Sequence, residues 1–295
     1  MPLRRHVHTR QLAELDPQQD YAQMLRIFAR HEFPLDMLLS GELAQLKTFA
    51  IPRMSALLHR TGQYEQHSVK RLDDTRAILT EILQDGVDGP HGAKMVEHLN
   101  RIHGHYKIAN DDYLYTLSLF IYEPIRWLRR FGWRAMTTAE EQGLFMAFRA
   151  LGEAMHIRDI PSTLAAFERW REDYRARMEV YAPSNQQVCD GAIHGLSQML
   201  PRPLRGLARP LVKVLLDDPA LLAALGLGKP SRSLGAVVWL VLKGRAWWLR
   251  RFNPWEVASF QDSPLALHYA SYPRGYQPFR LGPEKIIRLL ERQAA

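Results

Sequence analysis

The chain has 295 residues, of which 46% are hydrophobic and 24% charged, a composition that excludes disordered and fibrous proteins. The formal net charge of +8 favours anionic partners, but the basic residues are spread along the chain without a nucleic-acid-binding signature, so we expect no nucleic-acid partner. The N-terminus, "MPLRRHVHTRQLAEL", lacks the apolar segment of a secretory signal, and no apolar run approaches the roughly 18 residues of a membrane-spanning helix.

Apolar residues recur at three- and four-residue spacing between Pro and Gly residues, and alternating runs typical of strands are rare. This pattern predicts an all-α fold of about ten or more helices in a single large domain over residues 1–295. We expect a core at about 35–190, further helices with a Trp/Arg-rich segment at about 201–260, and an irregular tail at 261–295. A short helix, Pro283 to Arg292, would end that tail. The single cysteine, Cys189, is expected to be a small buried hydrophobe and not a reactive thiolate.

The segment "KRLDDTRAILTEIL", residues 70–83, reads as an amphipathic helix. At about 100° per residue, Arg71 and Thr75 fall inside its apolar stripe, Asp74 at the edge and Asp73 on the opposite side. A guanidinium that faces the core needs a partner, because an unpaired buried charge is costly. The partner of Arg71 is therefore a carboxylate of the protein or an anionic group of a ligand.

The next helix, "AKMVEHLNRIHGHY" at 93–106, places His103 on its apolar face and directs His98 and His105 to the margin or to solvent. An inward histidine is either a hydrogen-bonded core residue or a ligand. Together with the inward arginine it matches the needs of haem, an imidazole for iron and a guanidinium for a propionate. A covalent c-type haem is excluded because no CxxCH occurs.

A non-haem metal would need at least two further ligands. Nearby candidates are His105, Asp111 and Asp112, but their helical phases do not converge with that of His103. We interpret Asn110 to Asp112 as the turn and N-cap of a following helix, whose aromatic rings form a buried face and which Pro124 ends.

A later segment joins an apolar run, Leu234 to Leu242, to the Trp/Arg pairs of "WWLRRF". This composition suits an interfacial helix at a membrane surface, and equally a buried core helix with a basic end. Since the sequence shows neither a secretory signal nor a membrane-spanning run, we expect a cytoplasmic protein. Peripheral membrane contact through this segment is an open alternative. The oligomeric state is not indicated.

Three stretches, "KRLDDT", "HLNRIHGHYKIANDDYLYTLSLFIYEPIRWLRRFGWR" and "LGEAMHIRDIP", resemble in this order the family of latex-clearing proteins (rubber oxygenases) and mycophenolic-acid side-chain oxygenases. The similarity is strongest to the fungal-type branch and runs from about Leu35 to Asp190. It implies an all-α protein with a globin-like core that holds haem b non-covalently and uses dioxygen to cleave isoprenoid double bonds. By the same resemblance, His103 corresponds to the iron ligand, and Arg71 and Thr75 to residues beside the haem.

Two departures from the family argue against polyisoprene cleavage itself. Rubber oxygenases carry a lysine where this chain has Asp74, and their catalytic glutamate has no clear counterpart, Glu65 being the nearest carboxylate. We expect a haem b-dependent oxygenase of a small apolar, unsaturated substrate that is isoprenoid or lipid-like. Arg71, Asp74 and Thr75 are its expected catalytic residues; His103, Arg71 and Thr75 would bind the cofactor, with His103 on iron. The alternative is a non-catalytic haem- or lipid-binding carrier or sensor of the same fold.

Overall fold

The computed structural model describes residues 6–252 and 269–294, which form fifteen α-helices, one π-helix and two 3-10 helices without a strand. The first half contains α1 (Val7–Glu14), α2 (Tyr21–Ile27), the π-helix η1 (Phe28–Glu32), α3 (Pro34–Thr48), α4 (Pro52–Thr61), α5 (Gln63–Gln66), α6 (Ser68–Asp85), α7 (Pro90–His103) and α8 (Asn110–Phe131). The second half contains α9 (Thr138–Ala154), α10 (Leu164–Met178), α11 (Pro183–Ser197), η2 (Arg202–Leu207), α12 (Ala208–Leu216), α13 (Pro219–Ala224), α14 (Arg232–Phe252), η5 (Pro278–Arg280) and α15 (Glu284–Ala294). The predicted all-α fold is confirmed.

Proline marks the start of many of these helices. Five of them, α3, α4, α7, α11 and α13, begin at Pro34, Pro52, Pro90, Pro183 and Pro219. The fixed φ angle of proline suits the first helical position, where its missing N–H has no partner to lose. The prolines that punctuate the sequence are therefore helix starts as much as helix ends.

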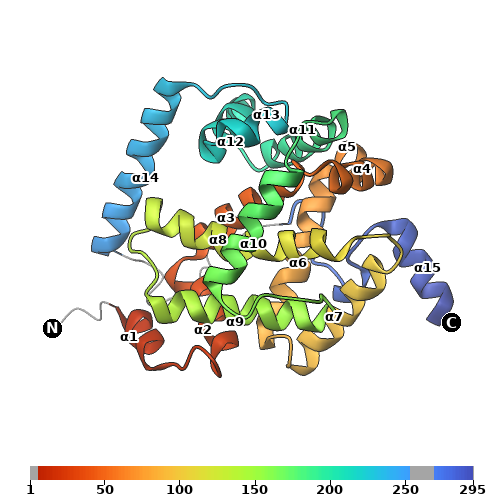
Figure 1. The fold of residues 1–295 in the computed structure, drawn as a ribbon, viewed down its shortest axis with the longest axis horizontal. Helices are drawn as coiled ribbons and strands as arrows, with labels where there is room; N and C mark the ends of the chain where they lie inside the picture. Colours follow the sequence, from red (N-terminus) through yellow and green to blue (C-terminus); the bar gives the residue numbers. More distant parts are fainter. Residues whose placement is uncertain (1–5, 253–268, 295) are drawn as a thin grey trace.

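Helix α8 crosses the middle of the molecule and packs against α3, α9 and α10 (Figure 1). The prediction that Pro124 ends this helix is wrong, because α8 continues through it to Phe131. Proline removes one backbone hydrogen bond, but Pro124 is buried, and packing on several sides holds the helix together. The start at Asn110 is confirmed, whereas the cap is not: Ala109 is the N-cap, and the Asn110 side chain instead bonds the backbone of Arg158 at 2.8 and 2.9 Å.

The segment that precedes α15, residues 269–283, covers α6 and α7. Its Ser271 N–H donates to Asp73 at 2.9 Å, and its Leu281 carbonyl lies 2.8 Å from Nε2 of His98. Helical phase placed Asp73 away from the apolar stripe and His98 at the margin or in solvent, yet each is only 2% exposed. The prediction for His98 is wrong because a distant segment of the chain buries it. We call residues 269–283 the C-terminal strap.

One hydrophobic cluster extends from Leu12 in α1 to Leu281 in the strap. Cys189 belongs to it with no exposed surface, and burial raises the pKa of its thiol to about 12. The predicted single domain and the unreactive cysteine agree with this core. The helix expected at the C-terminus is α15, shifted by one or two residues.

Helix α14 lies along one edge of the molecule, attached mainly to α12 (Figure 1). Only Ala246 and Leu249 of this helix are buried, so the alternative of a buried core helix is wrong. The exposed large apolar residues of α14 are Val237, Trp239, Leu240, Val241, Trp247, Trp248 and Phe252. Among the described helices, none has the length and apolar character needed to cross a membrane. The remainder of the expected Trp/Arg-rich segment and the start of the tail, residues 253–268, lie outside the described part.

Candidate functional site

A cavity of about 270 Å³ lies between α3, α4, α6, α7 and α8. His103, Arg71, Asp74 and Thr75 all contribute to its wall. The four residues that the sequence predicted as site residues therefore lie together at one cavity. Most of the remaining wall is apolar and includes Phe49, Leu57, Leu79, Leu99, Leu117 and Phe120.

His103 is the last residue of α7. Its Nδ1 atom is buried without a hydrogen-bond partner, and its ring centroid lies 5.6 Å from that of Tyr113. Burial, with a smaller contribution from the Arg71 cation, lowers the pKa of His103 to about 4. The imidazole is therefore neutral near pH 7 and keeps a lone pair for a ligand.

Arg71 has no carboxylate partner within the described residues. Its guanidinium donates to the Thr75 hydroxyl one turn along α6 and lies 5.3 Å over the ring of Tyr64. The sequence predicted that Arg71 pairs with either a protein carboxylate or an anionic group of a ligand. Since the described part of the chain provides no such carboxylate, the Arg71 cation is available to bind an anionic ligand group.

Asp74 is 3% exposed and accepts hydrogen bonds from Lys70 Nζ at 2.7 Å and from the Tyr272 hydroxyl of the strap. The sequence predicted neither Tyr272 nor this closure of the cavity. Glu65, the carboxylate nearest in sequence to the place of the family's catalytic glutamate, is exposed and pairs with His59 at 2.8 Å. It is not part of the cavity wall.

The cavity wall contains a second carboxylate, which the sequence offered as a metal-ligand candidate with a helical phase that did not converge with that of His103. Asp112, also assigned to a helix cap, is 2% exposed and pairs with Arg53 at 2.8 and 2.9 Å and with the Tyr174 hydroxyl at 2.5 Å. Its helical spacing was the available signal, because Asp112, Thr116 and Phe120 are four residues apart and all line the cavity.

A second cavity of about 380 Å³ lies between α2, α3, α6, α8 and α9. The two cavities share six wall residues: Gln45, Thr75, Leu79, Phe120, Phe148 and Leu151. Its lining is also mainly apolar, with the Glu42 carboxylate beside Arg76 at 2.5 Å. The site thus consists of two adjoining apolar chambers with Thr75 between them.

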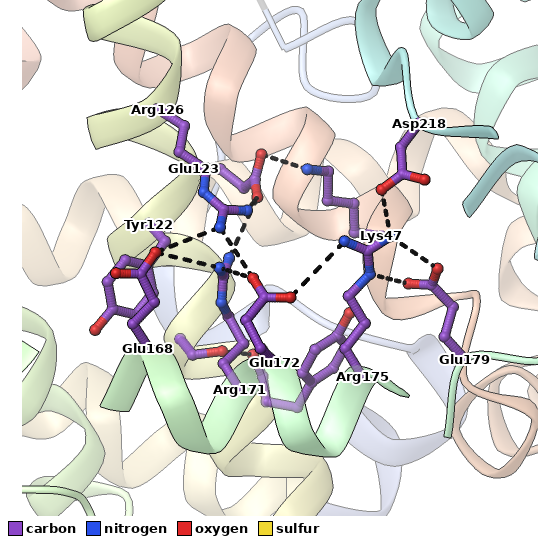
Figure 2. Close-up of polar contacts among 12 residues, drawn as sticks. Lys47, Tyr122, Glu123, Arg126, Glu168, Arg171, Glu172, Arg175, Glu179 and Asp218 are labelled. Atoms are coloured by element: carbon purple, nitrogen blue, oxygen red, sulfur yellow. Dashed lines mark hydrogen bonds and ion pairs between the residues drawn. The ribbon is translucent and has the colours of Figure 1, made fainter. Parts of the chain in front are cut away.

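The "EPIRW" motif mainly serves the framework. Figure 2 shows Glu123 of α8 facing Lys47 of α3, with Arg171 of α10 close by. The Lys47–Glu123 distance is 2.6 Å, and Arg171, 2% exposed, lies 2.5 Å from Glu172. Neither Glu123 nor Arg126 is among the described residues that line the two cavities. This network ties three helices around the site and does not enter it.

The donor set suits haem better than a metal ion held by protein ligands alone. In the described ranges, no group of three or more His, Cys, Asp or Glu residues could hold a metal ion. A haem iron needs one axial protein ligand, apolar walls for the ring and cations for the carboxylates. These three needs are met by the unpartnered ring nitrogen of His103, by the apolar cavity wall and by Arg71, which no described carboxylate neutralises.

Comparisons with known proteins find similarity to oxygenases. A family model described as the catalytic domain of ER-bound oxygenase mpaB/B' and rubber oxygenase matches residues 26–251. The chain is 30% identical to ER-bound oxygenase mpaB' of Penicillium brevicompactum over 81% of this chain and 60% of that protein. It is 32% identical to ER-bound oxygenase mpaB of the same fungus, over 56% of this chain and 46% of the relative. It is 27% identical to mpaB of Penicillium roqueforti, over 66% and 72% respectively. The chain thus spans less than two thirds of the first two relatives.

Proposed function

The chain belongs to the family of the mpaB and rubber oxygenase catalytic domain, and from this membership we propose that it is a haem b-dependent oxygenase of an apolar, unsaturated substrate. The observation that carries the proposal is His103, whose ring nitrogen is buried and unpartnered at the wall of an apolar cavity. When bound, haem b would supply the dioxygen chemistry that amino-acid side chains lack.

The neutral ring of His103 would hold the iron, since burial keeps it from taking up a competing proton. The Arg71 guanidinium, which has no carboxylate partner in the described part of the chain, would pair a carboxylate of the haem or stabilise negative charge that develops in the cavity. Thr75 lies one turn from Arg71, where the two cavities adjoin, and would orient a polar group by a hydrogen bond.

Asp74 would act as the acceptor of a proton relay that ends at the strap. Lys70 and Tyr272 both donate to its carboxylate, so its two oxygens are fixed at the cavity wall. The adjoining apolar cavity would hold the chain of an isoprenoid or lipid-like substrate, which its mainly hydrophobic lining favours over a polar one.

An absorption spectrum with iron content per chain tests the cofactor. We expect a Soret band in the purified chain or after hemin titration, abolished by His103→Ala and largely retained by His105→Ala, because His105 is exposed and its ring bonds the Arg101 carbonyl. A chain that stays colourless with hemin, or the reverse ranking of the two variants, overturns the assignment. Dioxygen uptake with unsaturated lipids then tests turnover; a Soret band without uptake indicates a carrier or sensor.

We also propose peripheral membrane association through α14, in keeping with the ER-bound relatives. Its outward face carries Trp247 and Trp248, 67% and 46% exposed, next to Arg250 and Arg251. Tryptophan and arginine at headgroup level are typical of interfacial helices. We expect Trp247→Ser/Trp248→Ser to reduce co-sedimentation with phosphatidylserine vesicles several-fold, while Tyr181→Ser, at another exposed aromatic, leaves it unchanged. Equal sedimentation of both variants contradicts this role.

A further inference from the structure

A basic cleft of about 500 Å³ lies between α15 and the start of α6. Four of its described lining residues are Lys or Arg and one is Glu, so its formal charge is positive. The lining residues are Gln63, His67, Lys70, Glu284, Lys285, Arg288, Leu289 and Arg292. We call this feature the basic cleft.

Helix α15 turns a basic face toward the cleft and an apolar face toward the protein. Ile286 and Ile287, 8% and 6% exposed, pack against Ile102 of α7. Lys285, Arg288 and Arg292 follow at spacings of three and four residues, which places them on one side of the helix. Packing of the apolar face thus fixes the direction of the three cations.

Two of the cations in the basic cleft have no polar partner among the described residues. Arg288 pairs with Glu284 at 3.1 Å and Lys70 with Asp74 at 2.7 Å. Lys285 and Arg292, in contrast, form no ion pair or hydrogen bond with a described residue. The cleft therefore has more positive charge than its own carboxylates neutralise.

The basic cleft adjoins the cavity that holds His103. Gln63 lines both. Lys70 lines the cleft, and its Nζ atom donates at 2.7 Å to Asp74 and at 2.8 Å to the Gly282 carbonyl, two residues of the cavity wall. An apolar chamber with a cationic cleft at its rim is complementary to a molecule with an apolar chain and an anionic head.

We propose that the basic cleft binds the carboxylate or phosphate head group of an amphiphilic substrate whose apolar chain extends along the His103 cavity into the adjoining apolar cavity. The inference rests on the proposed function in treating this ligand as the substrate. Lys285 and Arg292 are the specificity-determining residues, because their charges are free to pair with the head group. A neutral molecule with the same chain gains only the apolar contacts.

Calorimetric titration of the full chain loaded with hemin tests this, with monomeric oleate against oleyl alcohol and farnesyl phosphate against farnesol. We expect the anionic member of each pair to bind about tenfold tighter or more. Lys285→Gln/Arg292→Gln should remove this preference and leave the affinities for the neutral members and for hemin unchanged. The control Lys94→Gln/Arg274→Gln removes two exposed charges outside the cleft and should keep the preference.

Equal affinity of the native chain for both members of a pair overturns the proposal, as does equal loss in the control. A parallel loss of hemin affinity assigns the basic cleft to the haem carboxylates instead. Preference for phosphatidylserine vesicles without preference among the monomeric ligands makes it a bilayer contact, which also overturns the proposal. If the chain binds no haem yet retains the head-group preference, the proposed oxygenase fails while the head-group site stands.

Discussion

The lowered pKa of His103 comes from its burial and from the cation of Arg71 on α6. Burial and the Arg71 cation both disfavour its protonated form, so the pKa falls from 6.5 to about 4. An unfolded His103 takes up a proton near pH 6.5, whereas the folded one does so only near pH 4. Between these values the unfolded chain binds more protons, so stability decreases as the pH falls.

We expect acidification of the haem-free chain from pH 6.5 to 4 to lose about 3 kcal/mol through this residue. The measurement is urea unfolding at several pH values. His103→Asn cannot take up the proton and should show a flatter pH dependence, while His105→Ala, at an exposed position, should follow the native chain. Parallel pH profiles for His103→Asn and the native chain would contradict a buried neutral imidazole.

The helical phase correctly predicted which way some side chains point and failed for others. His103, Arg71 and Thr75 reach the cavity because their surroundings come mainly from helices that pack on the expected apolar faces. His98 failed because the Leu281 carbonyl, far along the chain, reaches it. A helical wheel contains no information on contacts made by a distant segment.

At the level of elements, α8 depends on charges that its sequence pattern does not reveal. Glu123 is 8% exposed and opposes Lys47, whose pKa burial lowers, while Arg171 lies 3.8 Å from the same carboxylate. Trp127 of the same motif donates to Asp36 at 2.8 Å, and Asp36 also binds Arg245 of α14. The "EPIRW" motif was visible in the sequence, but its partners lie on α3 and α10, with α14 joined through Asp36, and could not be assigned.

Glu123→Gln should destabilise the protein by about 3–5 kcal/mol, because Lys47 and Arg171 would lose a charge partner in a buried environment. Glu168→Gln is the matched control, since Glu168 belongs to the same network but is 50% exposed, and should cost less than about 1 kcal/mol. Urea unfolding midpoints at neutral pH compare the two. Similar losses for both variants would show that burial does not set the strength of this network.

At the scale of the whole molecule, the C-terminal strap completes the walls of the two cavities between the helices. Gly282 and Pro283 line the His103 cavity, and Tyr269 lines the adjoining one. The strap is fastened to α6 by tyrosine hydroxyls, Tyr272 to Asp74 and Tyr276 to Glu81 at 2.7 Å. The sequence indicated an irregular surface segment here; its docking site depends on long-range packing that local periodicity does not encode.

Tyr272→Phe/Tyr276→Phe removes both hydroxyl donors and retains the rings. Burial raises the pKa of each tyrosine, so both remain protonated donors to carboxylates at neutral pH, and each such bond contributes about 1.5–3 kcal/mol. Local opening of the strap should therefore become about 100-fold or more easier, which hydrogen exchange at the Tyr272 amide, bonded to the Tyr269 carbonyl, would report. Tyr181→Phe, at an exposed hydroxyl bonded to Gln186, should leave that exchange unchanged.

Because the strap covers the His103 cavity, the double variant Tyr272→Phe/Tyr276→Phe should also bind hemin faster than the native chain. Unchanged hydrogen exchange together with an unchanged rate of hemin binding would show that packing alone holds the strap.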